Sequence, residues 1–423
     1  MSIVIKNGRI INPSDRMDTV ADLKVIGDRV DKIACSIPPD DGDEVIDASG
    51  CWVMPGFIDM HVHLRDPGQT HKETIETGMD AAANGGFTTI VSMGNTIPAV
   101  DSVETYSYVM DKAQKKGTVT VLQAGTITKG LSGEELSDIE GLVKAGCRVF
   151  SEDGKSVMNS ALMRHAMQTI EKAGGIILDH CEDKPLVEGG VVNATEAARL
   201  GVNCISNAVE DIIAVRDIML ARETGVRLHL CHCSTKAAEE YLYRAKQMGV
   251  RVSGEVCPHH FTLCCEDIPD KNDANYKMNP PLRTRADVEA LRDGISKGVF
   301  DCISTDHAPH TENEKSGGFE KAPFGIVGLE TCAALTNTVL VNGGYLTPMG
   351  MAARMSYGPA QVLGIDRGDI SIGSIADIVV FNPKAGWVVD PDKFKSKGRN
   401  TPFTGKTLYG AVVNVIHEGC ITN

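Results

Sequence analysis

One short segment decides the fold, and it reads Phe57-Ile58-Asp59-Met60-His61-Val62-His63-Leu64-Arg65. Successive side chains of a β-strand point to opposite faces of its sheet. One face of this strand would be wholly apolar, whereas the other would carry Asp59, His61, His63 and Arg65. In an open sheet the polar face would be the solvent face. In a barrel, the apolar face is covered by helices and the polar face points into the interior near one mouth.

Short apolar runs alternate with amphipathic stretches of helical length after this segment. The apolar runs are Phe87–Met93, Val119–Ala124, Arg148–Ser151, Gly175–His180, Val226–His232, Gly249–Val256 and Asp301–Thr305. The helical stretches are Lys72–Asn84, Val103–Lys116, Ala161–Ala173, Ala208–Glu223, Lys236–Met248 and Arg285–Lys297. Such alternation indicates parallel βα units. The absence of a GxGxxG fingerprint favours a (β/α)8 barrel of the TIM type over a doubly wound sheet.

The two ends of the chain have a β-rich pattern instead. Short runs such as Ser2–Ile5 and Gly8–Ile11 are separated by Gly and Asp, as in hairpins, and Asp377–Phe381 and Ala411–Ile416 repeat the pattern. Each end is too small to bury a good core alone, so we expect the two to pair into one β-sandwich. We therefore predict two domains, a β-sandwich of residues 1–53 and 370–423 and a barrel of residues 54–369.

Composition narrows the class of protein. A net charge of −14 leaves no basic excess to neutralise phosphates, which argues against nucleic acid as the main partner. No apolar run approaches the roughly 20 residues that span a bilayer, and Met1–Lys6 is too short and polar for a signal peptide. The 13 cysteines are scattered without spaced CxxC pairs, as expected of reduced, mostly buried thiols. We expect a soluble, cytoplasmic protein.

Histidine and aspartate recur at positions suited to a metal centre. His61 and His63 share one strand face, where two imidazoles two residues apart can chelate one ion. Further candidates end later apolar runs or follow them directly: Asp153, His180, His232 and Asp306. Barrel enzymes place their catalytic groups at the carboxyl ends of strands. Each residue alone could be an ordinary core or surface residue, but together they predict a metal site.

Two loop segments also have a functional composition. Residues 277–283 are rich in proline and hydrogen-bonding side chains, which suits a rigid substrate loop. Residues 308–325 directly follow Asp306 and are rich in glycine and charge, which suits a mobile lid. Either segment could equally be an ordinary surface connection.

These motifs, in this order, resemble the long bacterial dihydroorotases of the amidohydrolase superfamily over essentially the whole chain. The motifs that carry the resemblance are Asp59–Gly68, Gly94–Thr96, Ser151–Lys155, Asp179–Glu182, Cys231–Thr235, Asn279–Arg283, Thr305–His310 and Pro323–Gly325. The chain departs from the family's pattern at Gly94, where proline is frequent, and at Glu152, where aspartate is usual. Neither departure removes a proposed ligand or substrate contact.

The resemblance implies two zinc ions in each subunit. His61, His63 and Asp306 would hold one ion, and His180 and His232 the other. The bridge would be Asp153 together with a water or hydroxide, whereas many relatives use a carbamylated lysine. Because Lys155 lies two residues further on, a modified lysine bridge stays an alternative.

The implied reaction is the reversible hydrolysis of (S)-dihydroorotate to N-carbamoyl-L-aspartate in de novo pyrimidine (UMP) biosynthesis. Asp306 would accept the proton of the attacking water and pass it to the departing ring nitrogen. Implied substrate contacts are Arg65, Asn95 and His310 for the carboxylate, Asn279, Phe324 and Gly325 for the ring amides, and His63 beside them.

Three other interpretations stay open. One is a hydantoinase- or dihydropyrimidinase-like hydrolase, which would normally carry the lysine bridge. Another is a non-catalytic scaffold for aspartate transcarbamoylase, although such proteins usually lose metal ligands and this chain retains all of them. The third is an enzyme that is active only, or better, in complex with the transcarbamoylase. The resemblance also makes a homodimer a reasonable expectation.

Overall fold

The computed structural model describes residues 2–423, and its middle part is built on parallel strands. These strands are β6 (Phe57–Val62), β7 (Phe87–Ser92), β8 (Thr120–Gln123), β9 (Gly125–Thr126), β10 (Val149–Ser151), β11 (Ile176–Asp179), β14 (Arg227–Leu230), β15 (Val252–Val256) and β16 (Cys302–Ile303). They pair in the order β6-β7-β8 and β9-β10-β11-β14-β15-β16, and only Ala124 separates β8 from β9. Val62 forms a parallel bridge with His307, so the region after β16 adjoins β6.

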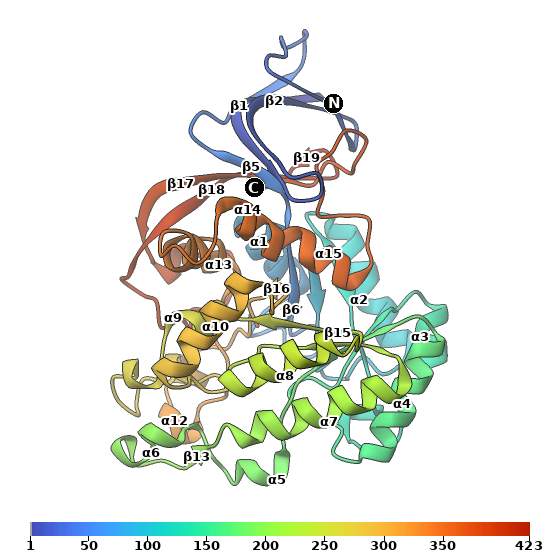
Figure 1. Cartoon of the computed structure of the whole chain (residues 1–423), viewed down its shortest axis with the longest axis vertical. Coiled ribbons are helices and arrows are strands. Elements are labelled where there is room, and N and C mark those ends of the chain that lie inside the picture. Colours follow the sequence, from blue (N-terminus) through green and yellow to red (C-terminus); the bar gives the residue numbers. More distant parts are fainter. Residues whose placement is uncertain (1) are drawn as a thin grey trace.

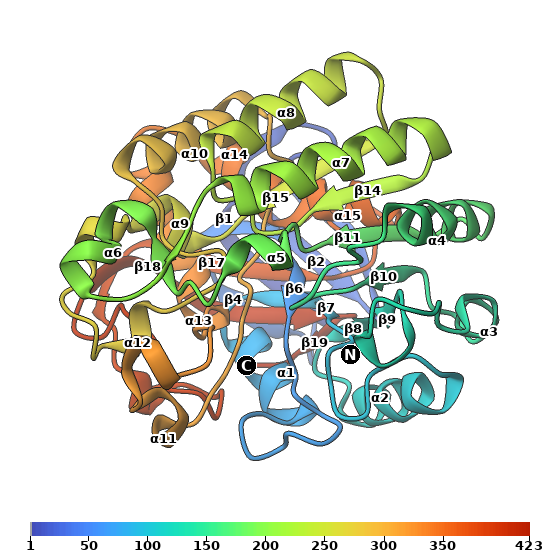
Figure 2. The ribbon, with the colours of Figure 1, turned by 90° about the horizontal axis from the view of Figure 1, so that it is seen from below.

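Helices connect these strands and surround them when the molecule is seen from below (Figure 2). The connecting helices are α1 (Ile75–Asn84), α2 (Val103–Lys116), α3 (Ile139–Lys144), α4 (Ser160–Lys172), α7 (Ala208–Thr224), α8 (Lys236–Gln247) and α10 (Arg285–Lys297). Local sequence sets their ends. Thr284 begins α10 with a capping box, and Gly298 ends it in the left-handed conformation. The predicted alternation of strands and helices is confirmed, and the bounds of α2 and α10 match the prediction.

Further short elements lie in the connections. They are α5 (Lys184–Val187), β12 (Val192–Asn193), α6 (Ala194–Leu200), β13 (Cys204–Ile205), α9 (Pro258–Thr262), α11 (Glu312–Lys315) and α12 (Gly318–Lys321). The helices α13 (Leu329–Leu335), α14 (Pro348–Ala352) and α15 (Gly358–Leu363) follow, with π-helical turns between them. The short elements of residues 184–205 could not be predicted from the sequence, because each is only two to seven residues long.

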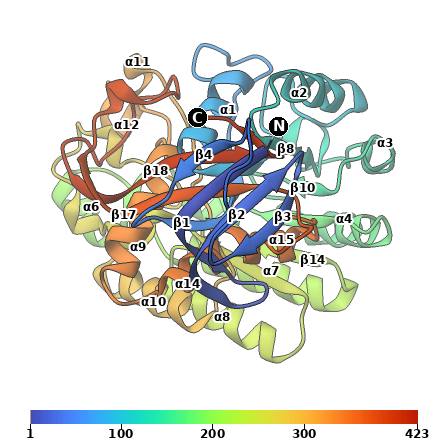
Figure 3. The ribbon, with the colours of Figure 1, turned by 90° about the horizontal axis from the view of Figure 1, so that it is seen from above.

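The two ends of the chain form one sheet, which lies across one end of the molecule (Figures 1 and 3). Its strands are β1 (Ser2–Asn12), β2 (Met17–Ile26), β3 (Arg29–Ala34), β4 (Glu44–Asp47), β5 (Trp52–Pro55), β17 (Ile378–Val388), β18 (Thr407–His417) and β19 (Cys420–Ile421). The order is β19-β18-β17-β5-β1-β2-β3, with β4 beside β1. The predicted pairing of the two ends is confirmed by the antiparallel contact of β5 with β17. All eight strands are hydrogen-bonded into a single sheet. The strand order does not test whether parts of this sheet pack face to face, so the β-sandwich stays a prediction.

The first strand differs from the prediction. Residues 2–5 and 8–11 belong to one continuous strand with an irregularity between Ile5 and Gly8, rather than to two strands of a hairpin. Asn7 takes up the irregularity with a positive φ of 60°. Asparagine tolerates this left-handed conformation better than most residues, so one extra residue can be accommodated without a turn.

Strand β5 leads through Gly56 directly into β6, which fixes where the sheet lies relative to the parallel strands. A Cβ atom on Gly56 would lie 2.3 Å from the Thr88 hydroxyl, so this close crossing requires glycine. The terminal sheet therefore lies at the amino end of β6. The carboxyl end of β6 points away from the terminal sheet, toward the face of the molecule that Figure 2 shows.

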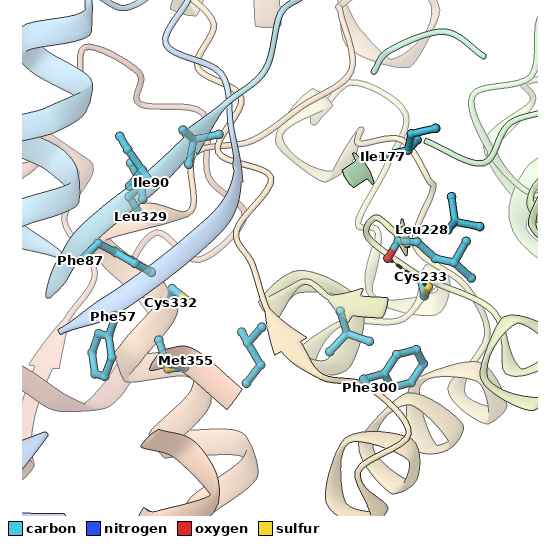
Figure 4. Close-up of a cluster of buried hydrophobic side chains, with 14 of the residues drawn as sticks. Phe57, Phe87, Ile90, Ile177, Leu228, Cys233, Phe300, Leu329, Cys332 and Met355 are labelled. Atoms are coloured by element: carbon cyan, nitrogen blue, oxygen red, sulfur yellow. Dashed lines mark hydrogen bonds between the residues drawn. The ribbon is translucent and has the colours of Figure 1, made fainter. Parts of the chain in front are cut away.

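Apolar side chains fill the space between strands and helices. Phe57 of β6 and Phe87 of β7 pack edge to face, with ring centroids 5.9 Å apart, close to Cys332 and Met355 (Figure 4). The terminal sheet has a separate apolar cluster, which includes Ile3, Val53, Ile378 and Ile416. All 13 cysteines are free, and ten of them are buried, as predicted. Among the helices of residues 2–423, none has both the length and the apolar character needed to cross a membrane.

Candidate metal centre and active site

The six predicted metal ligands all lie at the carboxyl ends of parallel strands. His61 is within β6, and the others follow strands by one to three residues: His63 after β6, Asp153 after β10, His180 after β11, His232 after β14 and Asp306 after β16. All six are buried. The structure therefore brings together every ligand that the sequence predicted.

Asp153 lies at the centre of this group. Its Oδ1 atom is 3.1 Å from His61 Nε2, 3.6 Å from His180 Nδ1 and 3.8 Å from His232 Nε2. Its Oδ2 atom is 3.5 Å from His63 Nε2. One carboxylate thus lies within 3.8 Å of four imidazole rings.

Asp306 lies on one side of the group. Its Oδ1 atom is 3.1 Å from His63 Nε2 and 3.7 Å from His61 Nε2. On the other side, His180 Nδ1 and His232 Nε2 are 2.9 Å apart. The ligand atoms of His61, His63 and Asp306 lie within 4.8 Å of one another, and so do those of His61, Asp153 and His232.

The donor set fits a divalent metal ion. The Nε2 atom of His61, which faces the cluster, is buried without a hydrogen-bond partner. Although His61 Nε2 is close to Asp153, the contact does not have hydrogen-bond geometry. Unpartnered buried polar atoms cost free energy, which a coordinated cation would offset. Imidazole nitrogens and carboxylate oxygens are ligands that zinc accepts.

The charges in the cluster favour the ligand form of the carboxylates. Burial alone would raise the pKa of Asp153, but His61 and His232 hold it well below its ordinary value. Burial likewise opposes ionisation of Asp306, and the hydrogen bond with His63 lowers its pKa overall. Both carboxylates are therefore anionic at neutral pH.

Glu255 on β15 contacts the histidines from outside the cluster, and its role was not predicted from the sequence. Its Oε1 atom is 3.3 Å from His61 Nδ1 and accepts the backbone N–H of His232, while Oε2 is 3.0 Å from His229 Nε2. A carboxylate behind a ligating histidine fixes its ring and tautomer. The available signal was a lone carboxylate within the apolar run 249–256.

Glu182 contacts His180 as Glu255 contacts His61, and this contact was not predicted from the sequence either. Its Oε2 atom is 3.0 Å from His180 Nε2 and accepts a hydrogen bond from the Asn279 amide. Because Glu182 lies only two residues after His180, the spacing itself was the available signal.

Three residues of the site have an unusual backbone conformation. Arg65, His232 and Asp306 have positive φ values of 60°, 35° and 48°, which are uncommon for residues other than glycine. Strained conformations of this kind cluster at functional sites, where the surrounding structure enforces them.

A cavity of about 400 Å³ opens above the cluster. It is lined by His63, Arg65, Asn95, Asp153, Gly154, His180, Glu182, Lys184, Val187, Glu188, Gly189, Ile205, His232, Asn279, Asp306, Ala308, Phe324 and Gly325. Every predicted substrate contact is in this lining except His310. Lys155 is exposed and outside the lining, whereas Asp153 is inside it.

Arg65 brings a positive charge into the cavity. Its guanidinium donates to the carbonyl oxygen of Pro309 over 3.3 Å and lies 3.2 Å from His310 Nε2, which in turn is 2.9 Å from the carbonyl oxygen of Phe324. Neither contact of Arg65 is a carboxylate, so its charge can serve an anionic ligand. Asn95 links this side to the cluster, because its amide contacts both His63 and Asp153.

Comparisons with known proteins identify the family of this chain. A family model described as dihydro-orotase-like matches residues 50–238. The dihydroorotase of Thermoanaerobacter sp. (strain X514) is 45% identical over 420 residues, covering 99% of this chain and 96% of that protein. The dihydroorotase of Pelotomaculum thermopropionicum is 44% identical over 411 residues, covering 97% of this chain and 96% of that protein.

Solved structures define the fold class. The L-hydantoinase (dihydropyrimidinase) of Arthrobacter aurescens superposes with a TM-score of 0.87 at 25% identity, covering 99% of this chain and 95% of that one. The dihydropyrimidinase of Brevibacillus agri gives the same TM-score at 23% identity, covering 100% and 95%. These are amidohydrolases of the TIM-barrel type, which confirms the predicted fold class at that level. From its full-length similarity at 45% identity, the chain belongs to the dihydroorotase family.

Proposed function

We propose that this protein is a zinc-dependent dihydroorotase, which hydrolyses (S)-dihydroorotate reversibly to N-carbamoyl-L-aspartate in pyrimidine biosynthesis. One observation carries the proposal: a single cavity joins the cluster of metal-ligand residues to the guanidinium of Arg65. A cyclic amide with a carboxylate substituent needs both features. The similarity to dihydroorotases over nearly the whole chain supports this assignment.

Two zinc ions would be held by the six ligands in the arrangement given by the resemblance. His61, His63 and Asp306 would hold one ion and His180 and His232 the other, with Asp153 between them. Zinc would lower the pKa of water and polarise a carbonyl oxygen as a Lewis acid. The contacts of Asp153 with four imidazoles support its role as the bridge over that of the exposed Lys155.

Asp306 would be the acid–base residue. It lines the cavity, and its lowered pKa keeps it deprotonated at neutral pH, the form that a base requires. Asp306 takes the proton of the attacking water and returns it to the ring nitrogen as the C–N bond breaks. In ring closure the same group takes the proton from the nitrogen of carbamoyl-aspartate.

The other cavity residues would orient the substrate. Arg65, Asn95 and His310 bind its carboxylate, with Arg65 as the charged donor. Asn279 and the segment of Phe324 and Gly325 bind the amide edges of the ring, and His63 borders it. The ring is thereby held with its scissile carbonyl toward the zinc ligands.

The fold favours one alternative, a hydantoinase- or dihydropyrimidinase-like hydrolase, because solved structures of that type superpose closely. Hydantoins and dihydropyrimidines lack the carboxylate that Arg65 would bind. A panel of dihydroorotate, hydantoin and dihydrouracil would separate the two functions.

The decisive experiment measures zinc content and dihydroorotate hydrolysis on the same purified sample, and then cyclisation of N-carbamoyl-L-aspartate at mildly acidic pH. We expect turnover in both directions, lost on removal of the metal and restored by zinc. Bound zinc without turnover of dihydroorotate would refute the proposed substrate. A protein that binds no metal would refute the proposed centre.

The larger organisation is part of the same proposal. Residues 54–369 form a closed (β/α)8 barrel, supported by the bridge between Val62 and His307, and residues 1–53 and 370–423 form a β-sandwich domain. The protein acts in the cytoplasm as a homodimer, alone or with aspartate transcarbamoylase.

A further inference from the structure

Two buried lysines lie beside the cavity without lining it. The side chains of Lys277 and Lys315 belong to residues only 4% and 6% exposed. The Lys315 ammonium donates to the carbonyl oxygens of Lys277, Pro323 and Gly325 over 3.2, 3.0 and 2.9 Å. Three acceptors match the three N–H donors of a lysine ammonium.

Lys277 makes a similar set of contacts. Its ammonium donates to the carbonyl oxygens of Phe319 and Ala322, each over 2.6 Å, and lies 4.5 Å from the centre of the Phe324 ring. Its backbone carbonyl also accepts the N–H of Gly325 over 3.0 Å. The hydrogen-bond acceptors of both ammonium groups are backbone carbonyls and not carboxylates.

This arrangement is costly, so it calls for an explanation. A buried ammonium without an anion loses its hydration, and backbone carbonyls replace only part of it. Burial accordingly lowers the pKa of Lys315 to about 7 and that of Lys277 to about 8. Methionine would fill the same space without burying a charge, but it would leave the carbonyl groups without donors. The two lysines must therefore contribute something that apolar packing cannot.

The two lysines hold residues 316–325, called here the 316–325 segment. Four of the five carbonyl groups that accept from the two lysines belong to this segment, from Phe319 to Gly325. The segment contains only one short helix, α12, and ends in Phe324 and Gly325, which line the cavity. Without strand partners, its carbonyl groups depend on side-chain donors for a fixed conformation.

We propose that Lys277 and Lys315 are positioning residues, a lysine pair that fixes the 316–325 segment so that Phe324 and Gly325 shape the substrate cavity. Lys277 also stands two residues before Asn279, another cavity residue, so it ties both substrate loops together. The inference rests on the proposed function for its kinetic consequence, but its structural consequence does not depend on the substrate.

The test compares the zinc-loaded wild type with Lys277→Met and Lys315→Met. The matched control is Lys321→Met, which changes an exposed lysine within the same segment. Two quantities are measured: amide hydrogen exchange of peptides covering residues 316–325, and KM and kcat for dihydroorotate. Loss of the carbonyl contacts should speed exchange in the segment about tenfold and raise KM about tenfold, with kcat and zinc content nearly unchanged. The control should match the wild type.

Each outcome is decisive. Unchanged exchange in both variants would overturn the lysine pair as the structure that holds the segment. Faster exchange with unchanged KM would overturn its role in shaping the cavity. If the wild type itself does not turn over dihydroorotate, the proposed function fails while the exchange measurement still judges the lysine pair. Should a methionine variant not fold, the same exchange and kinetic measurements are made on Lys315→Gln, which keeps two N–H donors without the charge.

Discussion

At the scale of single residues, the carboxylate of Glu255 links parts of the candidate metal centre that come from different strands. It contacts the His61 and His229 rings and the backbone of His232, and it is completely buried. Its charge sets which ring nitrogen of His61 carries the proton, and hence which one is free to bind a metal.

Glu255→Gln should therefore weaken metal binding while leaving the fold intact. Loss of a carboxylate behind a ligating histidine typically lowers metal affinity about 10- to 100-fold. Competition with a chromophoric chelator would measure the affinity, and Glu240→Gln, at an exposed position on α8, is the control. Equal zinc affinity in wild type and Glu255→Gln would show that the histidines orient themselves without this residue.

Arg65→Ala should separate substrate binding from metal binding. Removing the only charged donor that we assign to the substrate carboxylate should raise KM by about two orders of magnitude, because charge-assisted hydrogen bonds are the strong ones. Zinc content should stay at the wild-type value. Steady-state kinetics and metal analysis of one preparation test both statements, and unchanged turnover of dihydroorotate would refute the role of Arg65.

Asp211 on α7 makes stability depend on pH. Burial raises its pKa to about 6, with Thr235 opposing this shift and Glu210 adding to it. Between about pH 4 and pH 6 the folded protein then holds more protons than the unfolded chain, so the free energy of unfolding falls as pH rises through this window.

Asp211→Asn should reduce this pH dependence, because asparagine can still accept the Thr235 hydrogen bond but does not ionise. Between pH 5 and pH 8 the variant should lose about 1 kcal/mol less stability than the wild type. Urea unfolding at both pH values measures the difference. Asp293→Asn, at an exposed site, should behave like the wild type, and an identical pH dependence in Asp211→Asn would contradict the burial argument.

The clustering of the candidate metal ligands could be predicted from the sequence, whereas the residues that contact them from outside could not. Each candidate lies at or just after the end of an apolar run, so its place near a strand end is readable from the chain alone. Glu255 acts through His61, which is 194 positions away in the sequence, and its partner becomes visible only when β15 and β6 are placed in space. The lysine pair was hidden for the same reason, because its acceptors are backbone carbonyls.

At the scale of elements, prediction succeeded where local chemistry marks both ends. Helix α2 begins at the Ser102 cap and ends at Gly117, which is left-handed with a φ of 66°. Prediction failed where no capping residue or other local signal marks the ends of an element. The bulge in β1 looks like a turn, and the two-residue strands β12 and β13 pair only because the surrounding loops bring them together.

Gly117→Ala should cost stability without changing catalysis. A left-handed conformation costs residues with a Cβ atom about 1 kcal/mol, and nothing else crowds this position. Gly117→Asn should cost less, since asparagine tolerates this conformation. Chemical unfolding and kcat would be measured for both variants. A larger loss in the asparagine variant would contradict the conformational explanation.

At the scale of the whole molecule, the division between a parallel-stranded part and a sheet from the two chain ends could be predicted from the change in the spacing of apolar runs along the sequence. The sequence did not reveal that the ends would form one hydrogen-bonded sheet, because strand partners are a tertiary property. Amphipathic strands of this kind can pair edge to edge or pack face to face, and in this chain β5 pairs edge to edge with β17.

The pairing of β5 with β17 also sets an order of events when the chain is made. Pro55 is aligned with Ile378, so the ribosome must add more than three hundred residues before β5 meets β17. Until then the apolar side chains of β1 and β5 belong to an incomplete sheet with an open edge. Nascent chains aggregate through edges of this kind. The interior strands can assemble meanwhile, since their partners are close in sequence. The sheet that holds the first residues of the chain is thus among the last parts of the molecule to be completed.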